Sequence, residues 1–467
     1  MKEINENNLN RLAVSIMEKH FCSYDDAVER LLKLKLVLVC SEEIKNSLPL
    51  QAAFLTAINT GKRAFLGGVD VIIPKEVSCL LPWPRNNNLN EVVKEIGANI
   101  VSSQQNSSFS LYFGSRTNVE NNSLEVICNN WQGGVIINGD HGLKSNSTDN
   151  CPLGGIAAGS LAVALAFMVA SEIKIDAADQ STGISLWRPD LFWLEREAEG
   201  PALKFLPEKF WLLGLGHLGQ AYLWNIGLLP YETPSKVEVL LQDHDRIVDA
   251  NRSAGLLSEK IDIGDYKTRV CAKWLEDRLF KTRIVERKFD QFTKHNEEEP
   301  LIALCGFDSA ESRSQLEKSG FSLIVESALG GSLNLFDNII LHTFPDSFHK
   351  AESIWLTANN ENRVLNKSIL KEFSHLEEDG CGILAKNLAN KAISSSFVGA
   401  FAGSLVIAEL LRGLHGGKRY DTIVAQLRNL QFKKAFLHSN ENSLSELTIN
   451  GFCQLENKKN ILSKSSQ

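Results

Sequence analysis

Phe210–Pro230, FWLLGLGHLGQAYLWNIGLLP, is the stretch that decides the fold of this 467-residue chain. An apolar run leads into glycines at 214, 216 and 219, and a helical pattern follows them. Lys236–Asp245, KVEVLLQDHD, then predicts a second strand that ends in acids. A strand, a helix and a strand within about 35 residues form a right-handed unit, which implies a parallel sheet.

Later apolar runs extend this sheet along the chain. Leu301–Asp308, Phe321–Gly330 and Asn338–Phe344 each predict a strand, and Gly399–Leu411 predicts the helix that closes this part. Each of the first two runs ends in small or polar residues.

A repeated sequence pattern indicates an internal duplication. The pattern G-x-x-A-G-S-L occurs at Gly155–Leu161 and again at Gly399–Leu405, 244 residues later. Small residues at this spacing let a helix pack closely against a partner. We therefore expect two related halves, residues 1–200 and 201–467. The first half repeats the layout with a strand, a helix and a strand over 34–74, but its segment 41–50, SEEIKNSLPL, contains no glycine and predicts an inactive half.

Composition narrows the class of protein. The chain has 49 basic and 56 acidic residues, a net charge of −7, which argues against broad nucleic-acid binding. Its nine cysteines include no C-x-x-C pair, so we expect no structural zinc. The polar start predicts no secretory signal, and reduced thiols fit a cytoplasmic protein. The uncharged stretch Cys151–Ser171 predicts a buried core helix rather than a membrane span.

The glycines at 214, 216 and 219 have the spacing of a nucleotide-binding turn. They permit a tight turn whose backbone N–H groups approach phosphate oxygens at a helix N-terminus. Asp243 ends the next predicted strand, where an acid accepts hydrogen bonds from ribose hydroxyls. A nicotinamide dehydrogenase and an ATP-dependent enzyme fit these residues equally well.

Lys267, in the sequence DIGDYK, separates these two classes. A dehydrogenase has no use for a lysine at this place. An adenylating enzyme holds a triphosphate while a carboxylate attacks the α-phosphorus, and preorganised cations lower that barrier. Asp308, which follows a predicted strand, is suited to hold Mg²⁺ against the phosphate oxygens.

This succession of motifs over about residues 205–416 resembles the ubiquitin-activating superfamily, which includes the ThiF-like adenylyltransferases of thiamine and molybdopterin sulfur transfer. Members read G-x-G-x-x-G, D-x-D, N-x-N-R, D-x-G-x-x-K and a later Asp. The resemblance implies an α/β fold of two Rossmann-type ThiF-like halves with mainly parallel sheets, the second one binding ATP. It implies that Asp243 binds the ribose and that Asp245 is the second acid of the D-x-D motif. Asn251 and Lys267 would bind the phosphates, and Asp308 would bind magnesium.

The chain departs from the superfamily at one position. Ala254 stands where members usually carry a phosphate-facing arginine, and Arg252 lies two residues earlier. Arg252, or Arg269 in the following K-T-R, is expected to supply this charge.

Cys381 lies in a glycine-flanked stretch, EEDGCGIL, ahead of the last helix. In the superfamily a cysteine near this point accepts the activated carboxylate as a thioester, which suits a loop. The preceding acids raise the pKa of such a thiol, so a nucleophile and an ordinary loop cysteine both stay open.

The resemblance implies an ATP- and Mg²⁺-dependent enzyme that adenylates the C-terminal carboxylate of a ubiquitin-like protein. Cys381 would accept the acyl group and pass it to a ubiquitin-conjugating-like partner. Bacterial relatives occur in antiviral conjugation pathways. A homodimer, and a single chain whose first half replaces the second subunit, both stay open. Three alternatives remain: an adenylyltransferase that acts on a peptide or sulfur carrier without a thioester, an NAD-dependent oxidoreductase, and a non-catalytic scaffold.

Overall fold

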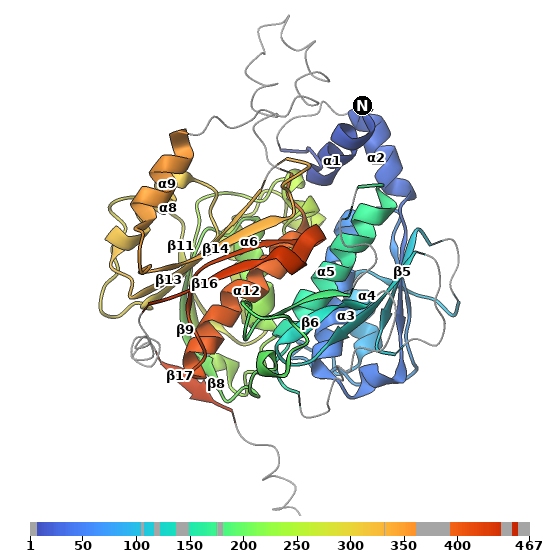
Figure 1. Ribbon diagram of the computed structural model, residues 1–467, viewed down its shortest axis with the longest axis horizontal. Helices are drawn as coiled ribbons and strands as arrows, with labels where there is room; N and C mark the ends of the chain where they lie inside the picture. Colours follow the sequence, from blue (N-terminus) through green and yellow to red (C-terminus); the bar gives the residue numbers. More distant parts are fainter. Residues whose placement is uncertain are drawn as a thin grey trace, which may run out of the picture.

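Two large β-sheets with a layer of helices between them form the centre of the protein, as the computed structural model in Figure 1 shows. The structure describes residues 7–103, 107–115, 122–136, 149–173, 175, 181–330, 332–360, 393–439 and 451–455. The first sheet takes its strands from the blue-to-green part of the chain, and the second from the green-to-red part.

The first sheet has seven strands in the order β3-β2-β1-β4-β5-β6-β7. Neighbours from β3 to β5 pair in parallel, and β6 and β7 are antiparallel additions. The strands are β1 (Leu36–Cys40), β2 (Val69–Ile72), β3 (Asn99–Ile100), β4 (Phe109–Phe113), β5 (Ser123–Cys128), β6 (Gln132–Ile136) and β7 (Thr182–Ser185).

The second sheet has eight strands in the order β11-β10-β9-β12-β13-β14-β15-β16. Its parallel and antiparallel neighbours follow the same succession as in the first sheet, with β16 added at the edge. The strands are β9 (Lys209–Leu213), β10 (Glu238–Gln242), β11 (Lys281–Val285), β12 (Ile302–Cys305), β13 (Leu323–Leu329), β14 (Asn338–Phe344), β15 (Tyr420–Gln426) and β16 (Lys434–Leu437). The shared topology confirms the predicted α/β fold with two Rossmann-type, mainly parallel sheets.

A short two-stranded sheet joins β8 (Phe205–Pro207) to β17 (Phe452–Gln454). The α-helices described are α1 (Arg11–His20), α2 (Tyr24–Lys33), α3 (Leu48–Ala64), α4 (Leu89–Ile96), α5 (Leu153–Ala170), α6 (His217–Gly227), α7 (Lys267–Glu276), α8 (Ala310–Ser314), α9 (Ala351–Asn360) and α12 (Ser396–Leu414).

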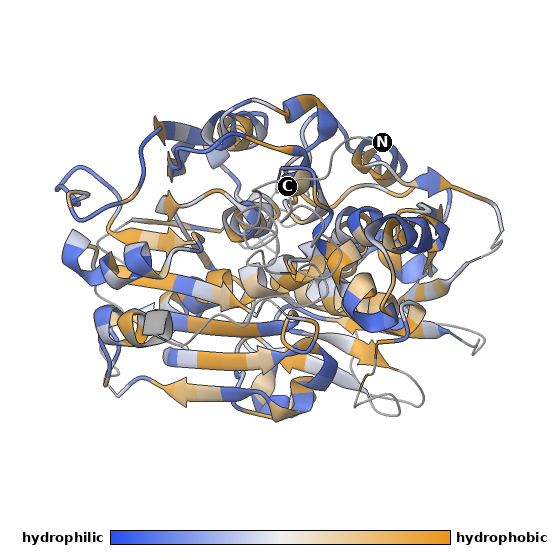
Figure 2. Cartoon of the chain, turned by 90° about the horizontal axis from the view of Figure 1, so that it is seen from above, coloured by the Kyte–Doolittle hydropathy of each residue, from blue (hydrophilic) through white to orange (hydrophobic). Residues whose placement is uncertain are grey.

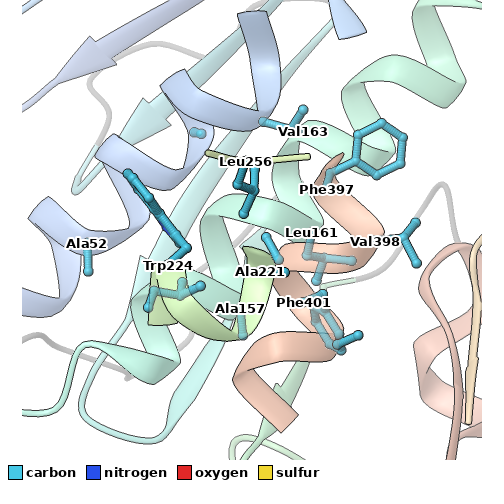
Figure 3. Close-up of a cluster of buried hydrophobic side chains, with 14 of the residues drawn as sticks. Ala52, Ala157, Leu161, Val163, Ala221, Trp224, Leu256, Phe397, Val398 and Phe401 are labelled. Atoms are coloured by element: carbon cyan, nitrogen blue, oxygen red, sulfur yellow. The ribbon is translucent and has the colours of Figure 1, made fainter. Parts of the chain in front are cut away.

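Four helices, α3, α5, α6 and α12, pack against one another between the two sheets. Figure 3 shows how their side chains meet, with Ala52 of α3, Leu161 of α5, Trp224 of α6 and Phe401 of α12 in one apolar cluster. Burying these apolar surfaces stabilises the contact by about 25 cal/mol per Å². The two halves therefore share one continuous core.

The repeated glycines lie where these helices touch. An added Cβ at Gly159 of α5 would stand 2.1 Å from the carbonyl oxygen of Ala53 in α3. In the other half, a Cβ at Gly403 of α12 would stand 2.9 Å from the carbonyl oxygen of Ala221 in α6. The repeated sequence pattern thus marks the same close helix contact in each half.

Helices α5 and α12 are long and apolar enough to cross a membrane by length and composition alone. Both are buried over most of their length, and α5 is the helix that the sequence predicts as a buried core helix. In Figure 2 the apolar residues likewise concentrate in the strands and the enclosed helices, whereas the outer helices and loops are mainly hydrophilic.

Replacing Gly159 by alanine tests this close approach. Helix propensity alone would make Gly159→Ala stabilising by about 1 kcal/mol. Because the new methyl group would meet backbone, we expect a net loss of about 1–3 kcal/mol in the free energy of unfolding, measured with urea.

Gly61→Ala in α3 is the matched control, because its Cβ would meet side-chain methyl groups and no backbone: Leu36 Cδ2 at 2.9 Å and Val69 Cγ2 at 3.4 Å. A side-chain end can shift, so this variant should lose clearly less stability. Equal effects of the two substitutions would contradict the proposed role of the helix contact.

Candidate functional site

A glycine turn joins β9 to α6 at the point where the strand order of the second sheet reverses, between β9 and β12. Gly214 has φ +83°, and a Cβ there would stand 2.8 Å from the backbone nitrogen of Phe307. A Cβ at Gly219 would stand 2.0 Å from the carbonyl oxygen of Gly214, whereas one at Gly216 meets nothing within 4 Å. Gly214 and Gly219 are therefore required by packing, and Gly216 faces open space at a helix N-terminus, where anions bind favourably.

Hydrogen bonds connect this turn to the end of β10 and to α7. Asp243 is buried and accepts from the backbone N–H of Leu215 at 2.6 Å and of Asp245 at 2.8 Å. Lys267, the first residue of α7, donates through Nζ to Asp245 at 2.7 Å. The side chain of Lys267 is 10% exposed and that of Asp245 is 52% exposed. The structure thus brings Asp243, Asp245 and Lys267 together beside the glycine turn.

Asn251 and Arg252 lie in the 3-10 helix η4 (Asp249–Ser253), which follows these acids. Asn251 accepts from the backbone N–H of Val248 at 2.9 Å, so its side chain fixes the start of the turn. Arg252 pairs with Asp249 at 2.6 Å and is 40% exposed, so water and ligands reach its guanidinium. The second candidate cation, Arg269, is bound by both carboxylate oxygens of Glu286 and points to that acid.

Asp308 follows β12, one residue after Phe307, which contacts Gly214. Its side chain is exposed and makes no hydrogen bond or ion pair with another described residue. An exposed carboxylate whose oxygens are not already bonded within the described residues suits a hard cation such as Mg²⁺. Within the described residues, the ligand atoms of Asp243, His244 and Asp245 also lie within 4.8 Å of one another. Asp243 and Asp245 already bond to backbone N–H groups and to Lys267, and histidine is a poor ligand for Mg²⁺, which favours Asp308.

Cys381 lies outside the described residues. The other eight cysteines are described, and all of them are unpaired thiols. Burial raises the pKa of seven of them, namely Cys40, Cys79, Cys128, Cys151, Cys271, Cys305 and Cys453. A raised pKa keeps a thiol protonated and therefore unreactive at neutral pH.

Three residues near the turn make contacts that the sequence analysis did not predict. Gln220 is buried directly after the turn; its amide donates to the carbonyl of Leu215 and its oxygen accepts from the N–H of Leu257 at 2.9 Å. His217 is partly buried and bonds through Nε2 to the carbonyl oxygen of Ser395 at 2.7 Å. The third residue, Arg63, comes from the first half. Only Gln220 and His217 carry a sequence signal, because both lie within or beside the glycine motif.

The corresponding place in the first half is filled by the chain itself. Between β1 and α3 a 3-10 turn, η1 (Glu42–Lys45), replaces the glycine turn. Glu43 accepts from the backbone N–H of Ser115, just after β4, at 3.2 Å and from its hydroxyl at 2.6 Å. A phosphate in this place would meet the negative charge of Glu43, which is unfavourable.

A cavity of about 230 Å³ lies elsewhere, between the two halves at the C-terminal end of α7. Trp83, Trp274 and Arg278 are among its lining residues. At 1.5 Å per helical residue, this end of α7 is about 15 Å from Lys267. The candidate site is therefore the open edge around the glycine turn and not this cavity.

Comparison with known proteins places the chain in a family. Residues 35–186 match the BilD N-terminal domain, and residues 206–417 match the BilD C-terminal domain. A curated relative, "Bacterial E1-like protein BilD" of Collimonas sp. (strain OK412), is 36% identical over 415 residues, 88% of this chain and 89% of the relative. The chain belongs to the BilD family. Membership confirms the E1-like character and supports an activating function in general.

Solved structures show more distant likenesses. Escherichia coli MccB has 13% identity and a TM-score of 0.36, with 67% of this chain and 94% of MccB covered. The E. coli structure of MccB with selenomethionine MccA has 13% identity and a TM-score of 0.33, with 50% and 64% covered. These values are too low to inform the site of the BilD-family chain.

The partly buried imidazole of His217 predicts a pH dependence of stability. Burial lowers the pKa of His217 to about 4, and the hydrogen bond to Ser395 only partly opposes this. Unfolded histidine has a pKa of about 6.5, so the stability from the neutral ring is complete above that pH and is lost as the pH falls towards 4. This group alone should remove about 2 kcal/mol of unfolding free energy between pH 7.5 and pH 5.

His217→Gln keeps a side-chain donor and removes the titration. Urea unfolding at the two pH values should therefore show a smaller pH effect in this variant than in the wild type. His349→Gln, at an exposed histidine, is the control and should behave as the wild type. An unchanged pH effect in His217→Gln would refute the assignment.

Proposed function

We propose that this BilD-family chain binds ATP with Mg²⁺ at the glycine turn of its second half and adenylates a protein C-terminal carboxylate. The observation that carries the proposal is the line of hydrogen bonds from the N–H of Leu215 through Asp243 and Asp245 to Lys267. It fixes an acid for ribose hydroxyls and a cation for phosphates around one open helix N-terminus.

The reaction joins a carboxylate oxygen of the substrate to the α-phosphorus and breaks the bond from that phosphorus to the oxygen bridging to the β-phosphate. Pyrophosphate leaves, and negative charge increases on the phosphate oxygens as this happens. Lys267 and the exposed Arg252 are placed to offset that charge, and they act from a rigid helix end and turn.

Asp308 would hold the magnesium ion, since its exposed carboxylate follows Phe307, which packs on the glycine turn. Mg²⁺ supplies charge neutralisation on the phosphate oxygens when it is bound. Arg269 is less suited to the phosphates than Arg252, because Glu286 already holds its guanidinium in a two-bonded pair.

An NAD-dependent oxidoreductase uses the same turn and the same acid, but it gives Lys267 no task. In this chain the ammonium of Lys267 is almost buried and aimed at the acids beside the turn. Asp245 already pairs with this ammonium, and the phosphates of a bound triphosphate would be a second negative partner for it. The lysine therefore favours ATP over NAD.

The substrate proposed is the C-terminus of a ubiquitin-like protein, because the family relative is named E1-like. Cys381 is the thiol proposed to accept the acyl group: its sulfur bonds to the carbonyl carbon and AMP leaves. A conjugating-enzyme-like partner would then receive the acyl group. The raised thiol pKa values elsewhere support Cys381 over most other cysteines. A cytoplasmic, antiviral setting stays a prediction.

Binding of ATP with Mg²⁺ should raise the stability of the wild type by about 2.7 kcal/mol at a ligand concentration near 100 times Kd. Lys267→Ala should abolish this thermal shift, because the phosphates lose their buried cation. NAD should give no shift with either protein.

Lys273→Ala, on the exposed side of the same helix α7, is the control and should keep the full ATP shift. A shift with NAD, or an ATP shift that survives in Lys267→Ala, would overturn the proposed site. No shift with either ligand in the wild type would favour the scaffold alternative.

Cys381→Ala separates the thioester route from adenylation alone. With a ubiquitin-like protein as substrate, the variant should keep ATP–pyrophosphate exchange and lose a thiol-sensitive covalent adduct, seen by non-reducing electrophoresis. Cys79→Ala, at a partly buried thiol, should keep both activities. An adduct that persists in Cys381→Ala would place the thioester on another cysteine. No adduct in the wild type, or a fully active Cys381→Ala variant, would favour the adenylyltransferase without a thioester.

A further inference from the structure

Arg63 of the first half inserts its side chain into the second half. It lies in the last turn of α3, and its side chain is only 4% exposed. Each of its three nitrogen atoms donates hydrogen bonds. The acceptors are the carbonyl oxygens of Arg252 at 2.8 Å, Leu256 at 2.9 Å and Ser258 at 3.0 Å, the carboxylate of Glu259 at 2.9 Å, and the amide oxygen of Asn59 at 3.3 Å.

These acceptors, apart from Asn59 in α3 itself, belong to one segment, residues 252–259. The segment links η4, which carries Asn251 and Arg252, to the stretch that leads into α7 and Lys267. Because Arg63 bonds mainly to main-chain carbonyls, it fixes the path of the segment rather than one side chain. Arg252 therefore lies at the start of the stretch that the other half holds, and Lys267 follows eight residues after its end.

The opposite side of the segment is held by Gln220. Its amide oxygen accepts from the N–H of Leu257 at 2.9 Å and from the hydroxyl of Ser258 at 3.0 Å. Its amide nitrogen donates to the carbonyl of Leu215 in the glycine turn at 3.1 Å. A continuous set of hydrogen bonds thus runs from Arg63 through the segment to the glycine turn.

Neighbouring residues of α3 strengthen the same contact. Lys62 pairs with Glu259 at 2.8 Å, and Asn59 donates to the carbonyl of Leu256 at 3.2 Å. A planar guanidinium satisfies several acceptors at once, whereas the ammonium of lysine is a compact charge with three donors. Arg63→Lys therefore keeps the charge and loses part of the geometry.

We propose that Arg63 is a positioning residue for the nucleotide, through which the half without a glycine turn sets the shape of the nucleotide site in the other half. This inference rests on the proposed ATP function. Arg63 touches no reacting atom; it holds residues 252–259 so that Arg252 and Lys267 meet the phosphates together with the glycine turn.

Arg412 provides a matched control. It is fully buried in α12 and also joins the halves, donating to the carbonyl of Leu186 in the first half, to the carbonyl of Lys418 at 3.1 Å and to Glu409. Among the residues that the structure describes, its hydrogen bonds go to Leu186, Lys418 and Glu409 and not to residues 252–259. A role in holding the halves together is therefore common to both arginines, and a role at the nucleotide segment belongs to Arg63.

The test compares wild type, Arg63→Lys and Arg412→Lys as full-length proteins, at a temperature where all three are folded. The dissociation constant of ATP with Mg²⁺ is measured by calorimetry, and hydrogen exchange of residues 252–259 is measured without nucleotide. Arg63→Lys should raise the dissociation constant about tenfold and speed exchange in the segment. Arg412→Lys should stay within about twofold of the wild type in affinity.

Glu259→Ala is the milder variant to use if Arg63→Lys does not fold, because Glu259 is half exposed; it should weaken ATP binding about threefold. Wild-type affinity in Arg63→Lys (or in Glu259→Ala, where that is used), or equal losses in Arg63→Lys and Arg412→Lys, would overturn the proposal. Faster exchange without a loss of affinity would overturn it too. A wild type that binds no ATP would instead refute the proposed function. The hydrogen exchange of residues 252–259 is measured without nucleotide, so it reports on the segment separately from ATP binding.

Discussion

The close packing of α3, α5, α6 and α12 is the constraint on which the rest of the structure depends. Backbone meets backbone at Gly159 and Gly403, so the helices approach to distances that no larger residue allows. This contact buries the apolar faces of both halves in one core, as Figure 3 shows. The relative placement of the sheets, and with it any site that uses both halves, follows from this helix layer.

The two halves have the same strand order, but they differ at the point where the strand order of each sheet reverses. In the second half the turn after β9 leaves open space at Gly216. In the first half the turn after β1 places the carboxylate of Glu43 against Ser115. The negative charge at this place therefore comes from a side chain of the protein and not from a bound phosphate. The first half therefore retains the fold without an open turn for a ligand, and its helix α3 contacts the candidate site of the second half.

The sequence could predict the parts of the fold that local residues determine. The strand, glycine turn and helix over 210–230 depend on apolar periodicity and on glycines at fixed spacing, and the repeated G-x-x-A-G-S-L reports a helix contact that both halves need. Asp243 and Lys267 could be found because a family motif places them. Arg63 could not, because its partners are about 190 residues away and are mostly main-chain carbonyls, which leave no side-chain pattern.

The Lys267–Asp245 pair shows how such a site can be ready before a nucleotide arrives. An unpaired ammonium at 10% exposure would be costly, and Asp245 offsets that cost in the absence of phosphate. Asp245 is itself half exposed, so water can solvate its carboxylate once Lys267 turns to a phosphate. The exchange of partners therefore leaves no buried charge unpaired. A carboxylate as buried as Asp243 could not release the lysine at so small a cost, which explains why the buried acid bonds to backbone N–H groups and the exposed acid holds the cation.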